Sequence, residues 1–257
     1  MRHRLWSAVT SIALVLAALT STFAAETLHV YGPGGPLPAM KEAAASFGKQ
    51  HGVEVVVTGG PTRNWLENAK RDGDLIYSGS EHMMTDFIHA LSAEVDASTV
   101  MPLYLRPSSI LVRPGNPKGI RGLRDVAKPG INILVVQGAG QTGLWEDMGG
   151  RTGDIDLLRA VRRNIRAFAP DSGKAKEAWT SDKSIDVWLI WNIWQVSNPD
   201  LAQAVPVEKE FVIYRDAAIA YTQRGKDKAA AQQFVQYLQG PEGARIFAKW
   251  GWMTPAR

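Results

Sequence analysis

Short apolar runs alternate with helical patterns along the N-terminal part of the chain. Residues 28–31 favour a strand, a glycine- and proline-rich turn follows, and residues 39–50 place Met40, Ala43 and Phe47 on one helical face. The same order recurs twice, with strands predicted at residues 53–58 and 74–77 and helices at residues 64–71 and 82–91. Three successive units of this kind predict an open, mainly parallel sheet with helices on both faces.

Two longer extended segments interrupt this pattern, at residues 101–113 and 211–219. Pro107 and Pro114 make the first segment a better crossing between lobes than a central strand. A second α/β set lies between the two segments, with strands predicted at residues 131–136 and 185–190 and helices at 123–127, 154–167 and 174–180. Two further helices, at residues 229–238 and 241–250, close the chain.

The predicted fold class is therefore α/β with two lobes, each a mainly parallel sheet flanked by helices, joined by two hinge strands. Lobe 1 is discontinuous and comprises residues 25–106 and 216–257, because the chain leaves it at the first crossing and returns at the second. Lobe 2 comprises residues 107–215. Lobes of this size are each large enough to bury a core.

The first 24 residues have the pattern of a signal peptide. Arg2 and Arg4 give a basic start, residues 5–18 form a short apolar run, and Thr22 and Ala24 offer the small side chains that a signal peptidase recognises. The apolar run is too short to span a bilayer. We therefore expect cleavage after Ala24 and export of the mature chain. The sequence contains no cysteine, so we expect neither a lipid anchor nor disulfide bonds.

The charge balance argues against a nucleic-acid partner. The leader removes two of the 29 basic residues, which leaves 27 against 25 acidic residues and a net charge of +2. The densest basic group consists of Arg159, Arg162, Arg163 and Arg166. Their spacing is typical of the solvated face of a helix rather than of a nucleic-acid surface.

Turns that suit an anion recur where predicted strands give way to helices. In open α/β sheets, ligands bind beyond the carboxyl ends of the strands, where helix N-termini present unpaired N–H groups. The candidate ligand residues at such turns are Gly34, Gly35, Pro36, Thr62, Arg63, Ser78, Ser80, Glu81, Gln141, Thr142, Gly143 and Ser172. One such turn alone is typical of ordinary helix capping. Five at equivalent positions, split between two lobes, favour a small anion in the cleft between them.

Arg63 and three further side chains could reach this cleft. Arg63 and Arg215 each carry a guanidinium that could hold a charged group, although a surface ion pair for Arg63 and a pair with Asp216 for Arg215 are the alternatives. Trp191 and Asn192 follow a predicted buried strand, where a ring could close over a ligand and an amide could donate to it. The alternative for the tryptophan is core packing.

Enzymatic patterns are weak in this sequence. A thiol nucleophile is excluded by the absence of cysteine, and Ser78-Gly79-Ser80 lacks the Gly-x-Ser-x-Gly elbow of a catalytic serine. The mature histidines show no i, i+4 pair for zinc, and the glycine-rich turn at residues 138–143 is not followed by Lys-Ser or Lys-Thr. We therefore expect no catalytic residue, no metal and no cofactor.

Two sets of motifs resemble a known family. Residues 110–120 and 123–127 resemble the crossing strand and following helix of type II periplasmic solute-binding proteins, the group that includes the molybdate- and sulfate-binding proteins. The runs VYGPGGP at residues 30–36 and IYSGSEHMM at residues 76–84 resemble the accessory colonization factor AcfC branch. The resemblance covers nearly the whole mature chain and implies a periplasmic protein whose two lobes close on an anion.

The resemblance also implies ligand positions. Those of the molybdate-type proteins fall on Gly34, Gly35, Pro61, Thr62, Thr142, Gly143, Ser172, and Trp191 or Asn192. The chain departs from that pattern because glycine and proline replace serines in the first loop and Arg63 is added. An added arginine suggests a larger ligand with a carboxylate, phosphate or sulfonate group.

Two functional hypotheses follow. The first is a periplasmic receptor that captures a small anionic solute and presents it to an ABC-transporter permease or a chemoreceptor. The second is a surface adhesin or antigen on the same fold that acts through protein or glycan contacts, for which nine tryptophans could supply the surface. The sequence leaves open whether the chain acts alone or as a homodimer, and no residue establishes a role in colonisation.

Overall fold

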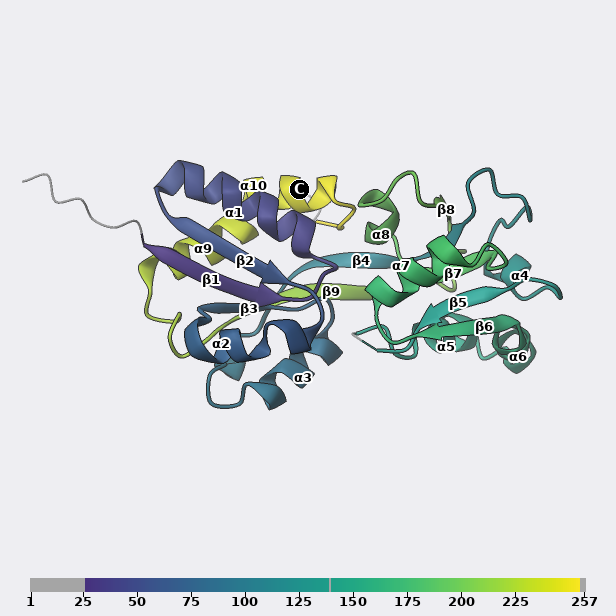
Figure 1. The fold of residues 1–257 in the computed structure, drawn as a ribbon, viewed down its shortest axis with the longest axis horizontal. Coiled ribbons are helices and arrows are strands. Elements are labelled where there is room, and N and C mark those ends of the chain that lie inside the picture. The colour runs from purple at the N-terminus through teal and green to yellow at the C-terminus, as the bar shows by residue number, and fades with distance from the viewer. Residues whose placement is uncertain (1–25, 139, 255–257) are drawn as a thin grey trace, which may run out of the picture.

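The computed structural model describes residues 26–138 and 140–254, so the predicted signal peptide lies outside the described residues. Figure 1 shows an elongated molecule whose helices and strands gather in two halves, one formed by both ends of the chain and one by its middle. Within the described ranges, no helix combines the length and the apolar character needed to cross a membrane.

The half formed by both chain ends contains four strands and five α-helices among the described residues. Its strands are β1 (Thr27–Gly32), β2 (Glu54–Gly59), β3 (Leu75–Tyr77) and β9 (Tyr214–Tyr221). Its helices are α1 (Leu37–His51), α2 (Leu66–Asp72), α3 (Glu81–Ala90), α9 (Ala229–Gln239) and α10 (Pro241–Lys249), with short 3₁₀ turns η1 (Thr62–Asn64) and η2 (Ala97–Thr99). Both faces of this sheet are covered, by α1, α9 and α10 on one side and by α2 and α3 on the other (Figure 1).

The middle of the chain builds the other half. Its strands are β5 (Ile133–Val136), β6 (Ile165–Ala169), β7 (Val187–Trp191) and β8 (Gln203–Val205), and its helices are α4 (Leu123–Val126), α5 (Leu144–Gly150), α6 (Ile155–Asn164), α7 (Ser172–Ser181) and α8 (Ile193–Val196). The long strand β4 (Met101–Val112) belongs to both halves.

The strand order is β2-β1-β3-β9-β4-β7-β5-β6, with β8 paired to β4. Pairing is parallel within β2-β1-β3 and within β6-β5-β7, and antiparallel where β9, β4, β7 and β8 meet. This arrangement confirms the predicted fold class, because each half has a parallel set of strands flanked by helices and the antiparallel strands join the halves.

The strand β4 changes partner in its middle. Met101 to Pro107 pair with β9, whereas Ser108 to Val112 pair with β7. The switch is fixed by two hydrogen bonds, in which the Ser108 backbone N–H donates to the Ile213 carbonyl at 2.8 Å and the Ile213 N–H donates to Ser108 Oγ at 3.0 Å. The residues on either side of this switch therefore lie where the two halves meet.

Alternation along the strands divides the core of the first half into two layers. Leu28 and Val30 on β1 pack in the main core with α1, whereas Tyr31 packs with the helices on the opposite face. Phe47 on α1 and Phe234 on α9 lie with ring centroids 5.2 Å apart. This contact brings the C-terminal helices onto the N-terminal one.

Two sequence predictions are wrong. The helix expected over residues 154–167 ends at Asn164, and strand β6 begins at Ile165. Ile165 and Ala169 are buried whereas Arg166 is exposed, which is the alternation of a strand, so Arg166 does not share the helical face of the arginines before it. The second extended segment begins as strand only at Tyr214, because residues 211–213 form a turn and its exit. The elements α5, α8 and β8 were not predicted.

Candidate functional site

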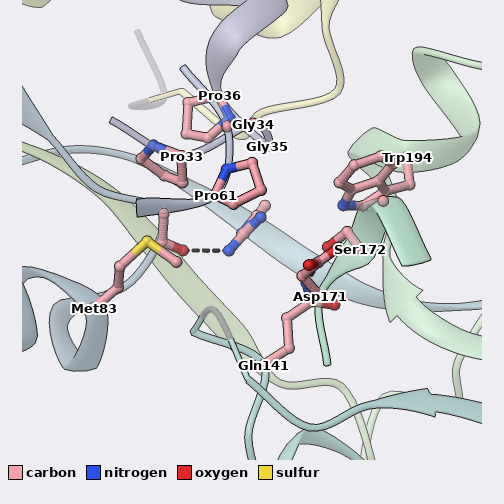
Figure 2. Close-up of a pocket in the computed structure, with 14 residues that line it drawn as sticks. Pro33, Gly34, Gly35, Pro36, Pro61, Met83, Gln141, Asp171, Ser172 and Trp194 are labelled. Carbon is pink, nitrogen blue, oxygen red and sulfur yellow. Dashed lines mark hydrogen bonds between the residues drawn. The ribbon is translucent and has the colours of Figure 1, made fainter. Parts of the chain in front are cut away.

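A cavity of about 220 Å³ lies where the two halves meet. Its lining from the half with both chain ends and from β4 is Pro33, Gly34, Gly35, Pro36, Gly60, Pro61, Gly79, Met83 and Arg106, and its lining from the middle of the chain is Gln141, Asp171, Ser172, Gly173 and Trp194. In Figure 2 the turn from Pro33 to Pro36, Pro61 and Met83 lie across the cavity from Asp171, Ser172 and Trp194.

The turn before α1 brings bare backbone to the cavity. Gly32 has no room for a side chain, because a Cβ there would overlap the Tyr77 carbonyl oxygen. A Cβ at Gly35 would lie 3.0 Å from Arg106 Nη1 and 3.3 Å from Ile193 Cδ1. Helix α1 then starts at Leu37 without a side-chain cap. The two glycines therefore allow strand β1, a guanidinium and a helix start to converge.

Arg106 is the buried cation of the cavity. It is 3% exposed, donates from Nη2 to the Gly79 carbonyl oxygen, and leaves Nε without a hydrogen-bond partner. Its guanidinium carbon lies 4.6 Å from the ring centroid of Trp191 and 5.4 Å from that of Trp252. In the described part of the chain, no carboxylate oxygen lies within ion-pair distance of it.

Burial lowers the pKa of Arg106 to about 9, while the charge of Asp216 opposes the shift and that of Arg215 adds to it. The guanidinium therefore remains charged at neutral pH, although it has lost most of its water. Because the charge of Asp216 acts only from beyond ion-pair distance, it compensates the burial of Arg106 in part, and an anion in the cavity would stabilise the guanidinium further.

Gln141 and Ser172 form a polar wall opposite the arginine. Gln141 is 4% exposed and donates from Nε2 to Ser172 Oγ, while its Oε1 has no hydrogen-bond partner. Ser172 and Gly173 occupy the first turn of α7, where backbone N–H groups have no partner within the helix. Polar groups of both kinds, donors and an acceptor, thus face the cavity.

Asp171 caps the same helix. Its Oδ1 accepts from the Lys174 backbone N–H at 2.9 Å, and its Oδ2 lies 3.9 Å from Arg63 Nη2. The side chain of Asp171 is 15% exposed and that of Arg63 is 72% exposed, so the aspartate faces the cavity while the arginine lies in solvent.

The structure brings five of the candidate ligand residues to the cavity lining, namely Gly34, Gly35, Pro36, Gln141 and Ser172. Pro61, a ligand position that the resemblance implied, also lines it. The predicted residues that do not line it are Thr62, Arg63, Ser78, Ser80, Glu81, Thr142, Gly143, Trp191, Asn192 and Arg215.

Several of these residues have other contacts. Ser80 Oγ caps α3 by accepting from the Met83 N–H at 3.2 Å. Arg215 Nη2 lies 2.5 Å from Asp147 Oδ2 on α5, rather than pairing with Asp216. Asn192 donates from Nδ2 to the Gly251 carbonyl oxygen at 2.6 Å, and Trp191 is 1% exposed beneath Arg106.

Sequence reasoning missed Arg106, Asp171, Met83 and Trp194. A signal for Arg106 was present, because it is one of two charged residues, with Arg113, in the mainly apolar and proline-containing crossing at residues 101–113. Asp171 was visible as a helix cap, which concealed its position on the cavity. No local pattern marks Met83 or Trp194.

A neighbouring chamber of about 240 Å³ lies beside the cavity. The two share Gly34, Gly35 and Trp194, and the chamber adds Pro38, Ile193, Ser197 and Asn198. Its lining carries no charged side chain, so the charge of the site is confined to the first cavity.

A small cavity between two α/β halves joined by long strands, with a buried cation in its wall, defines the class of solute-binding proteins. The chain belongs to the family of bacterial extracellular solute-binding proteins, whose family model matches residues 28–253.

Known structures agree with this assignment. The chain is 38% identical to PEB3 of Campylobacter jejuni, with a TM-score of 0.83, over 89% of this chain and 100% of that one. A structure of PEB3 bound to L-phospholactate gives 38% identity and a TM-score of 0.84 over the same shares. The sulfate-binding protein SubI of Mycobacterium tuberculosis shares the fold, at 16% identity and a TM-score of 0.73 over 89% of this chain and 87% of that one.

A curated sulfate-binding protein of Synechococcus elongatus is 24% identical over 159 residues. The match covers 56% of this chain and 45% of that protein, so it spans less than half of the relative's length.

Proposed function

We propose that this protein is a periplasmic receptor that captures a small solute carrying both a carboxylate and a phosphate or related oxyanion group. The ligand would bind in the cavity and be delivered to an ABC-transporter permease or a chemoreceptor. The observation that carries the proposal is Arg106, a buried guanidinium on the cavity wall without a carboxylate partner among the described residues.

The chemistry of the lining supports an anion. Arg106 supplies the charge, Gln141 and Ser172 supply polar atoms, and the starts of α1 and α7 supply backbone N–H groups. An anion that reaches Arg106 provides the missing counter-ion in a site where little water screens the pair. Gly34, Gly35 and Pro36 keep side chains out of its way.

The size of the cavity supports a small ligand. A volume of about 220 Å³ is below the range typical of drug-sized sites, which begins near ~300 Å³. The structure of PEB3 with L-phospholactate supports a phosphorylated carboxylic acid of a few carbon atoms as the ligand class. The run at residues 76–84 supports placement in the AcfC branch, and the leader supports export.

Closure of the lobes would create affinity. We propose lobe boundaries at 106/107 and 215/216, next to the place where β4 exchanges β9 for β7. Ligand contacts from both lobes favour the closed arrangement over the open one. Thr62, Arg63, Thr142 and Gly143 remain predicted contacts of a ligand larger than the cavity.

The adhesin alternative gains no support from the tryptophans. The eight tryptophans in the described ranges are all buried or partly buried, so they form no exposed aromatic surface. Trp6 lies in the predicted leader, outside those ranges.

Isothermal titration of the mature protein with L-phospholactate, L-lactate, inorganic phosphate and sulfate tests the proposal. The protein is first unfolded and refolded to remove any solute that co-purifies. We expect L-phospholactate to bind most tightly and, at a hundred times its dissociation constant, to stabilise the fold by about 2.7 kcal/mol.

The variant Arg106→Gln should weaken this binding at least about 30-fold, since losing one partner of a buried charge pair costs about 2–5 kcal/mol. Arg163→Gln removes an exposed arginine of α6 and is the matched control. Unchanged affinity in Arg106→Gln, or no binding of any of the four anions, would refute the proposal.

A further inference from the structure

The wall of the proposed anion site contains a carboxylate, that of Asp171. Asp171 lines the same cavity as Arg106, and it stands across from the Gly34–Pro36 turn in Figure 2. Its Oδ1 is occupied by the Lys174 backbone N–H at 2.9 Å. Its Oδ2 has one ion-pair contact in the described ranges, with Arg63 Nη2 at 3.9 Å.

The arginine does not neutralise this oxygen effectively. At 3.9 Å it is at the limit of an ion pair, and its side chain is 72% exposed, so water screens the interaction. The charge of Lys174 also acts on Asp171, but this side chain is 55% exposed and is paired with Glu177. Asp171 Oδ2 therefore keeps negative charge and free lone pairs at the cavity that the residue lines. An ionised carboxylate only accepts hydrogen bonds.

Two oxyanions facing each other without a proton between them repel, and the repulsion grows as water is excluded. A ligand group at this position must therefore bring an O–H. A phosphate monoester can do so, because its second pKa is about 6 and its singly protonated form carries a P–O–H. A sulfate ester has the same shape and no proton to donate at that pH.

Resting on the proposed function, we infer that Asp171 selects a phosphate ester in its singly protonated form and rejects the isosteric sulfate ester. The P–O–H of the bound ester donates to Asp171 Oδ2, while the remaining phosphoryl oxygens accept from the N–H groups at the start of α7. Asp171 is then a specificity residue as well as a helix cap.

Substitution by asparagine separates these two roles. Asparagine caps helices as well as aspartate does, so Asp171→Asn keeps the bond to the Lys174 N–H through its amide oxygen. The amide nitrogen then takes the place of Oδ2 and donates a hydrogen bond, which either ester can accept. The variant should therefore fold normally, and the only property it loses is the requirement that the ligand donate a proton to residue 171.

The experiment is a titration at pH 6 with L-phospholactate and with the O-sulfate of L-lactate. The singly protonated phosphate ester and the sulfate ester then carry the same net charge. We expect the wild-type protein to bind the phosphate ester at least about 30-fold more tightly, and Asp171→Asn to bring the two within about threefold.

Glu177→Gln is the matched control. It removes one negative charge from the same helix, at a side chain that is 66% exposed and paired with Lys174, and should leave the 30-fold preference intact. Asp171→Ser, which also caps the helix, is the second variant and should likewise lose the preference.

Three results would overturn the inference. If the wild-type protein binds both esters within threefold, Asp171 does not select, although the proposed anion receptor stands. If the preference persists in both Asp171 variants, another group selects. If neither ester binds to the wild-type protein, the inference and the proposed function fail together.

Discussion

The guanidinium of Arg106 lies over the ring of Trp191, with the guanidinium carbon 4.6 Å from the ring centroid. The arginine comes from β4 and the tryptophan from β7, which pair as neighbouring strands. An aromatic face attracts a cation through its quadrupole, more strongly where water is excluded. The ring therefore offsets part of the cost of burying the arginine.

Trp191→Phe should test this role. A smaller, less electron-rich ring attracts the guanidinium less, so we expect affinity for L-phospholactate to fall about three- to tenfold, in line with a cation–π loss of about 0.5–1.5 kcal/mol. The matched control is Trp179→Phe, which changes the same residue type under Arg113, at 3.8 Å and away from the cavity. Titration calorimetry measures both, and an equal loss in the two variants would contradict the assigned role.

Gly35→Ala should displace the arginine from the other side. The added methyl group would stand 3.0 Å from Arg106 Nη1, a distance at which one of the two must move. We expect about a tenfold loss of affinity, equivalent to about 1.4 kcal/mol, with the fold retained. Gly150→Ala on α5, where the nearest atom is 4.0 Å away, should leave affinity unchanged. Titration and circular dichroism of both variants separate a site defect from a folding defect.

Gln141→Glu should nearly abolish binding. The substitution keeps the shape of the side chain but places a negative charge in the anion cavity, 4% exposed in the wild-type protein. We expect affinity to fall at least about 100-fold, which corresponds to about 3 kcal/mol. The reason is that like charges repel strongly in a partly desolvated site. Gln236→Glu is the matched control, because it makes the same substitution at an exposed residue of α9 outside the cavity lining. It should leave the dissociation constant unchanged. Retained affinity in Gln141→Glu would place the ligand elsewhere.

Asp125 should make folding stability sensitive to acid. Hydrogen bonds from Arg121 and Lys128 hold the pKa of this carboxyl far below its usual range. A depressed pKa in the folded state contributes stability that is complete above the unfolded value of about 4 and is lost as the pH falls below it.

We therefore expect Asp125→Asn to lower the free energy of unfolding at pH 7 by about 1–2 kcal/mol and to narrow this difference steadily below about pH 4. Urea unfolding at pH 7, 4 and 3 measures the effect. A difference that stays constant over this range would mean that the charge of Asp125 contributes nothing.

Local chemistry explains which parts of the site could be predicted. Gly34, Gly35 and Pro36 were found because a helix start reached by bare backbone has a recognisable sequence, and Ser172 because it opens a capped helix. Gln141 was found in a glycine-rich turn. These signals depend on a few consecutive residues, which a sequence displays directly.

The cation was missed because its environment is assembled from distant segments. Arg106 is held by the Gly79 carbonyl and by the rings of Trp191 and Trp252, and none of these is near it in sequence. Arg215 was preferred because Tyr214 and Asp216 placed it in the return crossing, but its guanidinium reaches Asp147 on α5. Arg106 and Arg215 lie directly opposite each other on β4 and β9, so their contacts with distant segments, and not their positions along the strands, decide which one lines the cavity.

The strand β6 was missed for a similar reason. Residues 165–169 follow the arginine-rich helix without a glycine or proline between them, so the helical pattern seemed to continue. Tertiary pairing with β5 decides the outcome, because the backbone of Ile165 to Ala169 pairs in parallel with Ile133 to Val136 and extends that edge of the sheet.

The exchange of partners along β4 has a consequence for the order of events in capture. Pro107 is the last residue paired with β9 and Ser108 the first paired with β7, so Arg106 lies one residue from the point about which the lobes would swing. Atoms beside a pivot travel least when two bodies rotate. If the lobes close as proposed, Arg106 would keep its place in the open protein and meet an incoming anion first, and Gln141, Asp171 and Ser172 would contact the anion only on closure.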